Sequence, residues 1–218
     1  MKTSHHLRSS RLSSTNQRVF QHLDIVNVQP SLLACFKPIE LEMTSRLDEN
    51  RLTQHSIVKK VPGISTGFFE IKHHFNQEIK DFVVSVLSST SRFDKATKVS
   101  LTRGLMNYYS TDQKFSSRDH SPLMKPHHDN VNGADAAIVV GLSDASDFSG
   151  ALLFVSTTKR GKVWYDNVQE GTVSKSSVFG VNVIRGVVVA LWNDVEHYVG
   201  LLQCGKRFTI VIHVSFMK

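Results

Sequence analysis

Cysteine and long apolar runs are scarce in this chain, and each absence narrows the class of protein. The two cysteines, Cys35 and Cys204, lie far apart and belong to no C-x-x-C motif. This excludes a zinc ribbon and a disulfide scaffold and favours a reducing compartment. No apolar run approaches the roughly 20 residues of a membrane-spanning helix, so no membrane span is expected. With 218 residues, 40% of them hydrophobic and 21% charged, the chain suits one globular domain with its own core.

Acidic residues are absent from the first 23 positions, which are rich in serine and arginine. This stretch supplies four of the seven net positive charges, through Lys2, Arg8, Arg11 and Arg18. The other basic residues are scattered, and a nucleic-acid binder needs them gathered, so nucleic acid is a disfavoured partner. Residues 1–23 have the composition of a disordered basic tail or of an organelle transit peptide, and both interpretations stay open. We therefore expect a cytoplasmic protein, or an organellar one if this stretch is a transit peptide.

The remaining chain divides into two parts by its pattern of residue types. Residues 24–66 are interrupted by several prolines, and we expect an irregular segment there. Residues 67–218 are expected to form the single domain. Near its start, between Glu70 and Leu87, apolar residues recur at helical spacing and predict one amphipathic helix.

Beyond residue 100 the sequence becomes strand-like, with short runs of Val, Ile, Phe and Tyr between turn residues. The expected strands are 101–109, 136–142, 150–156, 162–165, 177–184, 186–192, 197–202 and 207–216. This pattern predicts a mainly β (α+β) protein, namely a cupin-like jelly roll or double-stranded β-helix with a supporting N-terminal helix.

The last expected strand has two different faces. Its apolar face suits packing against the helix and consists of Phe208, Ile210, Ile212, Val214 and Phe216. Its other face suits a partly polar barrel interior that holds a ligand, and consists of Arg207, Thr209, Val211, His213 and Ser215.

His127 and Asp129 lie two residues apart, so on an extended strand they project to the same side and can offer a nitrogen and an oxygen to one metal. Alone this signal is weak, because 11 histidines and 19 acidic residues give about one His-x-acid match by chance in 218 residues. His22-Leu23-Asp24 is such a match, in the tail. A facial triad needs a third ligand from a distant strand, and His197, at the start of a later strand, is the candidate.

Arg207 follows His197 by ten residues, and Thr209 lies two residues further on the same face. We expect a hairpin that turns at Gln203-Cys204-Gly205-Lys206 and brings Arg207 back towards the strand that begins with His197. A buried arginine is costly unless it meets an anion, and its planar fork matches a carboxylate.

These residues together resemble the 2-oxoglutarate/Fe(II) oxygenase superfamily, including its prolyl-hydroxylase-like enzymes. The resemblance covers residues 100–216 and rests on the ordered set His127-x-Asp129, Gly150, Gly186, His197 and Arg207-x-Thr209. It implies three Fe(II) ligands, which are His127, Asp129 and His197. It also implies three residues that hold 2-oxoglutarate, which are Arg207, Thr209 and, from the Asn107-Tyr108-Tyr109 run, Tyr109.

The implied activity is that of a dioxygenase that uses Fe(II), 2-oxoglutarate and O2, with ascorbate as an optional reductant. It would hydroxylate a C–H bond and release succinate and CO2. Asp129 fits hydroxylation, because halogenating relatives lack this carboxylate. The substrate is a protein side chain, as in the prolyl hydroxylases, or a small molecule. The alternative from another class is a non-catalytic jelly-roll module that binds a metal or a carboxylate.

Five further residues have their own interpretations. His128 should point away from His127, and His213 should share the inward face with Arg207. Trp192 is expected in the strand core. His73 and His74 are expected at the surface of the predicted helix.

Overall fold

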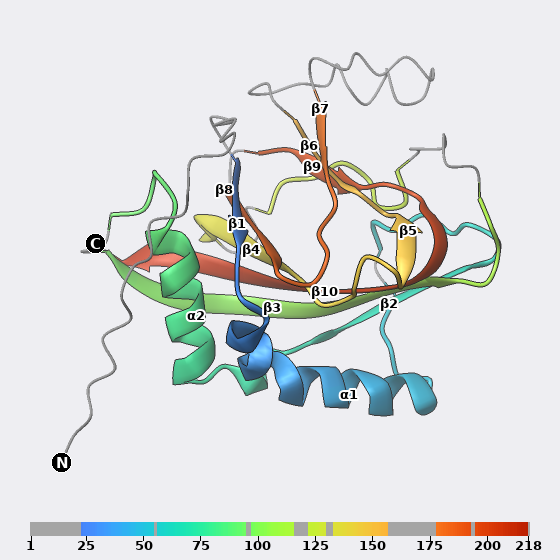
Figure 1. Ribbon diagram of the computed structural model, residues 1–218, viewed down its shortest axis with the longest axis horizontal. Coiled ribbons are helices and arrows are strands. Elements are labelled where there is room, and N and C mark those ends of the chain that lie inside the picture. The colour runs from blue at the N-terminus through green and yellow to red at the C-terminus, as the bar shows by residue number, and fades with distance from the viewer. Residues whose placement is uncertain are drawn as a thin grey trace.

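The computed structural model describes residues 23–54, 56–94, 97–115, 122–129, 133–156, 178–192 and 195–217 (Figure 1). The strands are β1 (Leu23–Asn27), β2 (Ile64–Glu70), β3 (Lys98–Thr111), β4 (Ala136–Gly141), β5 (Phe148–Gly150), β6 (Leu153–Ser156), β7 (Val178–Val181), β8 (Val187–Trp192), β9 (His197–Val199) and β10 (Leu202–Met217). The larger sheet has the order β1-β8-β4-β10-β3-β2, with β5 also paired to β10. The smaller sheet has the order β7-β6-β9. These strands pair antiparallel in two sheets, which is the predicted jelly roll.

Most expected strands are confirmed, with shifted ends. The run 101–109 is the middle of β3, 136–142 is β4, 186–192 is β8 and 207–216 lies within β10. The run 150–156 is not one strand. It breaks at Gly150 and Ala151, whose φ angles of 75° and 47° turn the chain from β5 in the larger sheet to β6 in the smaller one. The expected strand 162–165 lies outside the described residues.

The expected hairpin between His197 and Arg207 is wrong. Strand β10 runs without a turn from Leu202 to Met217, and the chain instead changes sheets between β9 and β10. Gly205 has a φ of 84°, and a Cβ there would overlap the carbonyl oxygen of Asp147. The residues that resemble a turn therefore form an irregularity within a long strand, where the pairing with β5 shifts register.

The expected helix 70–87 begins later than its apolar pattern suggested. Glu70 ends β2, a 3-10 turn η2 (Lys72–His74) follows, and α2 spans Gln77–Ser88. The side chain of Asn76 accepts a hydrogen bond of 3.0 Å from the Ile79 N–H, which caps α2 and sets its first turn. His73 and His74 consequently lie on η2 rather than on the helix.

The segment 24–66 was expected to be irregular, and this expectation is wrong. It contains β1, the 3-10 helix η1 (Pro30–Phe36), helix α1 (Lys37–Asp48) and the start of β2. Pro30 and Pro38 stand in the first turns of η1 and α1, where proline needs no N–H partner and has a suitable φ. Prolines that were interpreted as interruptions are therefore helix starts.

The two helices cover one side of the larger sheet, and the smaller sheet lies on its other side (Figure 1). Phe36 of η1 and Phe82 of α2 meet edge to face, with ring centroids 5.0 Å apart. Ile210, Ile212 and Val214 of β10 are fully buried in the same core. As predicted, one face of β10 is apolar, and four residues of its other face line the space between the sheets: Arg207, Thr209, Val211 and His213. Ser215, which was predicted on the same inward face, does not line it and donates to the carbonyl oxygen of Gly133. Among the described residues, no helix is long and apolar enough to span a membrane.

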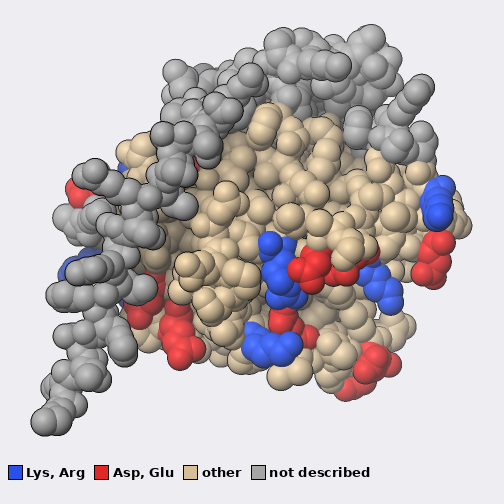
Figure 2. Space-filling view, in the orientation of Figure 1, with Lys and Arg blue, Asp and Glu red and all other residues tan. Residues whose placement is uncertain are grey.

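Charges of both signs are mixed on the face seen in Figure 2, where described Lys and Arg side chains lie among Asp and Glu side chains. This face carries no continuous basic stripe over the described residues.

Candidate active site

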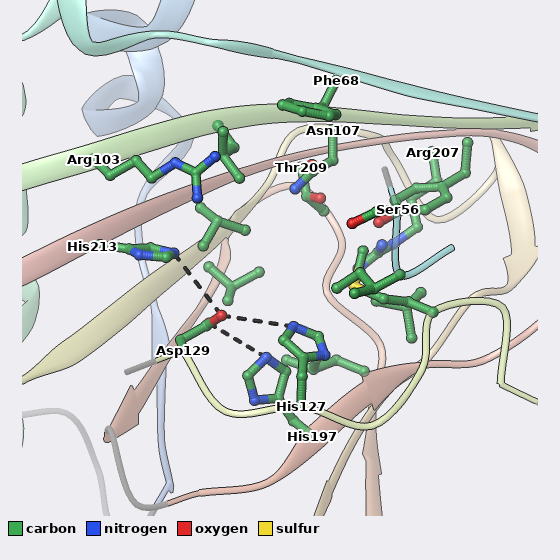
Figure 3. A pocket seen from close by; sticks show the side chains of 18 of the residues that line it. Ser56, Phe68, Arg103, Asn107, His127, Asp129, His197, Arg207, Thr209 and His213 are labelled. Carbon is green, nitrogen blue, oxygen red and sulfur yellow. Dashed lines mark ion pairs between the residues drawn. The ribbon is translucent and has the colours of Figure 1, made fainter. Parts of the chain in front are cut away.

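A cavity of about 400 Å³ lies between the two sheets (Figure 3). One of its walls is formed by four pairs of residues that stand opposite one another on β3 and β10. The pairs are Tyr109 with Arg207, Asn107 with Thr209, Leu105 with Val211, and Arg103 with His213. Directly opposed residues of an antiparallel pair project to the same side, so the register of β3 and β10 brings all eight side chains to the cavity.

His127 and His197 are brought together by the backbone. The N–H of each residue donates to the carbonyl oxygen of the other, over 3.0 Å and 2.9 Å, in an isolated antiparallel bridge between residues 122–129 and β9. Residues exchanging both hydrogen bonds in this way carry side chains on the same face. The two imidazole rings are accordingly neighbours, with centroids 4.4 Å apart.

Asp129 completes this cluster. One carboxylate oxygen lies 3.3 Å from His197 Nε2, and the other lies 3.6 Å from His127 Nε2 and 3.9 Å from His213 Nε2. Figure 3 shows the carboxylate between the three rings. The ligating atoms of His127, Asp129 and His197 all lie within 4.8 Å of one another.

Hydrogen bonds at the far side of each ring orient the two histidines. His127 Nδ1 donates to the carbonyl oxygen of Lys125 over 2.8 Å, and His197 Nδ1 donates to that of Val195 over 3.2 Å. A carbonyl oxygen can only accept, so Nδ1 carries a proton in both rings. In the neutral rings, Nε2 then has no proton, and it carries a lone pair that points towards the Asp129 carboxylate. Two lone pairs and an anion need a cation between them, and this donor set fits a divalent metal.

The charges in the cluster depend strongly on one another. Burial alone raises the pKa of Asp129, but His197, His127 and His213 outweigh it and lower this pKa. Burial lowers the pKa of His197, but the Asp129 carboxylate outweighs it and raises the pKa. The Asp129 carboxylate thus favours the charged form of the His197 ring. Burial is also the main cause that lowers the pKa of His213, which favours the neutral ring there.

Arg207 is the most deeply buried cation of the cavity, with 1% of its surface exposed. Its Nε and Nη1 have no hydrogen-bond partner among the described residues. Burial lowers the pKa of Arg207 to about 10, so the guanidinium is still charged at neutral pH. Its carbon lies 5.6 Å from the centroid of the Tyr109 ring and 6.0 Å from that of Phe148. A buried charge with free donors calls for an anion, and a carboxylate matches its geometry.

The cavity thus brings together all six residues that the sequence nominated: His127, Asp129, His197, Arg207, Thr209 and Tyr109. It also contains His213, whose inward position is confirmed. His128 is half-buried and does not line the cavity. Trp192 is in the core, as expected, and its Nε1 donates to Asp24 over 3.0 Å. In the His22-Leu23-Asp24 match, His22 lies outside the described residues.

Sequence reasoning did not assign roles to several lining residues. Arg103, Leu105 and Asn107 stand on the same face of β3 as Tyr109, and counting back in steps of two from Tyr109 finds them. Phe68 of β2 stands opposite Asn107 and also lines the cavity. Gln54 and Ser56 come from an irregular segment between α1 and β2, and no local pattern marks them.

No protein-family model matches the chain, and no curated protein matches it in sequence. Its fold, however, matches solved structures. One is a prolyl hydroxylase from Trichoplax adhaerens in complex with a hypoxia-inducible-factor peptide, with a TM-score of 0.54, 15% identity, and coverage of 88% of this chain and 83% of that chain. Another is a Pseudomonas putida prolyl-4-hydroxylase, with a TM-score of 0.51, 10% identity, and coverage of 88% and 92%.

A third match is the non-haem alpha-ketoglutarate-dependent epimerase SnoN from nogalamycin biosynthesis, with a TM-score of 0.52, 15% identity, and coverage of 91% of this chain and 79% of that chain. At these identities the likeness concerns the fold. The chain has the prolyl-hydroxylase-like jelly roll of the 2-oxoglutarate/Fe(II) oxygenases.

Proposed function

We propose that this protein is an Fe(II)- and 2-oxoglutarate-dependent dioxygenase that hydroxylates its substrate. One observation carries the proposal. Two imidazole nitrogens and a carboxylate converge on one point in the same cavity as a buried arginine with free donors. The first set suits a divalent metal, and the second suits the far carboxylate of a dicarboxylic acid that also reaches the metal.

His127, Asp129 and His197 would hold Fe(II) on one face and leave its other positions open. When bound, the iron with 2-oxoglutarate and O2 supplies the oxidising power, and succinate and CO2 are released. Arg207 would pair with the distal carboxylate of 2-oxoglutarate. Thr209 and Tyr109 stand beside it and can donate hydroxyl hydrogens. Burial raises the pKa of Tyr109 to about 12, so this phenol keeps its proton at neutral pH.

The remaining lining is largely apolar and includes Phe68, Leu105, Val139, Leu153 and Val199. An apolar wall excludes water, strengthens the charge interactions inside the cavity and protects the reaction from side products. The chain itself thus contributes geometry, charge and dryness, which is the usual contribution of a protein to a cofactor's chemistry.

For the substrate we propose a protein side chain first and a small molecule second. The fold is shared with a prolyl hydroxylase solved with a peptide, which favours the first class, and with an epimerase of nogalamycin biosynthesis, which favours the second. Profiling of Fe(II)-loaded protein against peptides and metabolites, with substrate-stimulated succinate release as the readout, distinguishes the two classes.

The test of the activity is succinate release from 2-oxoglutarate by Fe(II)-loaded protein in air, without any added substrate. Slow uncoupled turnover is expected from an oxygenase, and none from a jelly-roll module that only binds. His127→Ala, Asp129→Ala and His197→Ala should each abolish this turnover while the fold persists, because three ligands hold one metal with none to spare. His128→Ala is the matched control and should remain active. Turnover of the wild-type level in any of the three variants contradicts the ligand assignment.

A further inference from the structure

Three metal-ligating side chains also meet outside the cavity. Glu42 lies on α1, while His73 and His74 lie on η2, 31 and 32 residues further along the chain. His73 Nε2 and His74 Nε2 lie 2.9 Å and 2.5 Å from the same atom, Glu42 Oε2. None of the three residues lines the cavity between the sheets. The cluster is therefore independent of the proposed active site.

The Glu42 carboxylate of this cluster is held in place through its other oxygen. Arg46, one turn along α1, binds the other oxygen, with 2.6 Å between Arg46 Nε and Glu42 Oε1. The guanidinium of Arg46 is itself fixed over the ring of Phe69, 4.6 Å from the centroid. The side chains of Glu42 and His74 are 23% and 20% exposed, whereas His73 is 57% exposed. Glu42 Oε2 is thus directed at the two rings, and solvent can still reach the cluster.

We propose that Glu42, His73 and His74 form a second metal site, for Zn²⁺. Two imidazole nitrogens and one carboxylate oxygen are a donor set that zinc prefers, whereas Ca²⁺ and Mg²⁺ prefer oxygen ligands alone. The three ligating atoms lie within 4.8 Å of one another. Tetrahedral zinc, with bonds of about 2.0–2.2 Å, separates its ligand atoms by about 3.3 Å. Each of the two short contacts would open by less than about 1 Å, which needs only small rotations of the His73 and His74 rings.

A metal here would join α1 to the turn that precedes α2. The buried side chains of α1 are Ile39 and Met43, so the helix has a small apolar contact of its own. A link through Glu42 would hold it on the sheet in a way that depends on the metal. The charge of Arg46 beside the carboxylate limits the attraction for a cation, so we expect micromolar rather than tighter affinity. The fourth coordination position of the zinc would be taken by water.

The competing arrangement needs no metal, because two neutral rings can each donate an Nε2–H to Glu42. Titration of Zn²⁺ into metal-free full-length protein, in competition with a chromophoric chelator, distinguishes the zinc site from this metal-free arrangement. Wild type should take up two zinc ions, one of them at the site between the sheets. His73→Ala/His74→Ala should take up one, and Glu42→Gln should weaken the second site by about tenfold or more. Asp48→Asn, which removes the same charge from the exposed end of α1, should keep both.

Equal zinc uptake by wild type and by His73→Ala/His74→Ala overturns the proposal. A second measurement uses Asp129→Ala/His197→Ala, which lacks the other site. Saturating zinc should raise its Tm by about 5 °C, and adding the two η2 substitutions should remove this shift. If the combined variant does not fold, the ring signals of His73 and His74 in NMR spectra of wild type decide, because zinc must shift both. These readouts need no turnover, so they stand whether or not the dioxygenase proposal does.

Discussion

Replacement of Arg207 by lysine separates co-substrate binding from metal binding. Lysine keeps the positive charge, but it offers a single ammonium where arginine offers a planar fork. In the structure the Nε and Nη1 donors of Arg207 have no partner among the described residues. They lie on different edges of the guanidinium, so a carboxylate that binds bidentately takes one of them together with Nη2. Arg207 is also only 1% exposed, so this contact would form inside the cavity, where charge interactions are stronger than in water.

The magnitude of the effect follows from the two hydrogen bonds of such a bidentate pair. A hydrogen bond between charged groups contributes about 1.5–3 kcal/mol, so loss of one of them weakens binding by about tenfold or more. Loss of both hydrogen bonds weakens 2-oxoglutarate binding at least a hundredfold, because about 1.4 kcal/mol corresponds to a tenfold change in affinity. Fe(II) affinity without 2-oxoglutarate should barely change, because Arg207 belongs to no group of metal ligands.

The assay is anaerobic calorimetric titration of 2-oxoglutarate into Fe(II)-loaded protein, with a separate titration of Fe(II). Arg185→Lys is the matched control. Arg185 pairs with Glu40 and Asp144 at the surface, and its substitution should leave both affinities unchanged. If Arg207→Lys binds 2-oxoglutarate as tightly as wild type, then Arg207 is a structural cation and the reasoning about its free donors fails.

Two further predictions concern the N-terminal part. Deleting residues 1–22 should leave the urea midpoint nearly unchanged, because few of these residues are apolar. Deleting residues 1–27 also removes β1 and the buried Leu23, and should destabilise by about 2–5 kcal/mol. A large drop in the urea midpoint after the shorter deletion would show that the tail is part of the domain. Burial raises the pKa of Cys35 from 9.0 to about 11, so in a Cys204→Ser variant iodoacetamide should react with Cys35 at pH 7.5 about a hundredfold more slowly than with a peptide thiol. A rate equal to that of the peptide would refute this.

The strands, and two members of the candidate active-site cluster, were predictable because they depend on short-range patterns. Alternation in steps of two identifies the faces of β3 and β10, and it also places His127 and Asp129 on one side of an extended segment. The backbone bridge between His127 and His197 is not visible in the sequence. The sequence only nominated His197 as a third ligand, because it stands at the start of a later strand.

Arg207 reached the cavity by a different route from the one expected. A glycine flanked by polar residues indicates a turn, but the positive φ of Gly205 is used within the continuous strand β10. The same local conformation serves a hairpin and a bulge, so the pairing partners decide between them. Asp147 and Phe148, brought alongside by β5, are those partners, and they lie more than fifty residues away.

Helix α1 was missed for a related reason. Only a narrow apolar stripe, Ile39 and Met43, is buried on it, so its periodicity is weak. Its position depends on tertiary contacts such as the pairing of Arg185 with Glu40. The cluster of Glu42, His73 and His74 could not be anticipated either, because it requires α1 and η2 to be adjacent.

The most direct test of the account is a crystal structure of the protein soaked anaerobically with Fe(II) and 2-oxoglutarate, with anomalous scattering to locate the iron. We predict an iron peak about 2.1 Å from His127 Nε2, His197 Nε2 and an oxygen of Asp129, and the distal carboxylate of 2-oxoglutarate on the fork of Arg207. Iron at another position in the cavity, or a 2-oxoglutarate carboxylate that does not meet Arg207, would contradict the central claim.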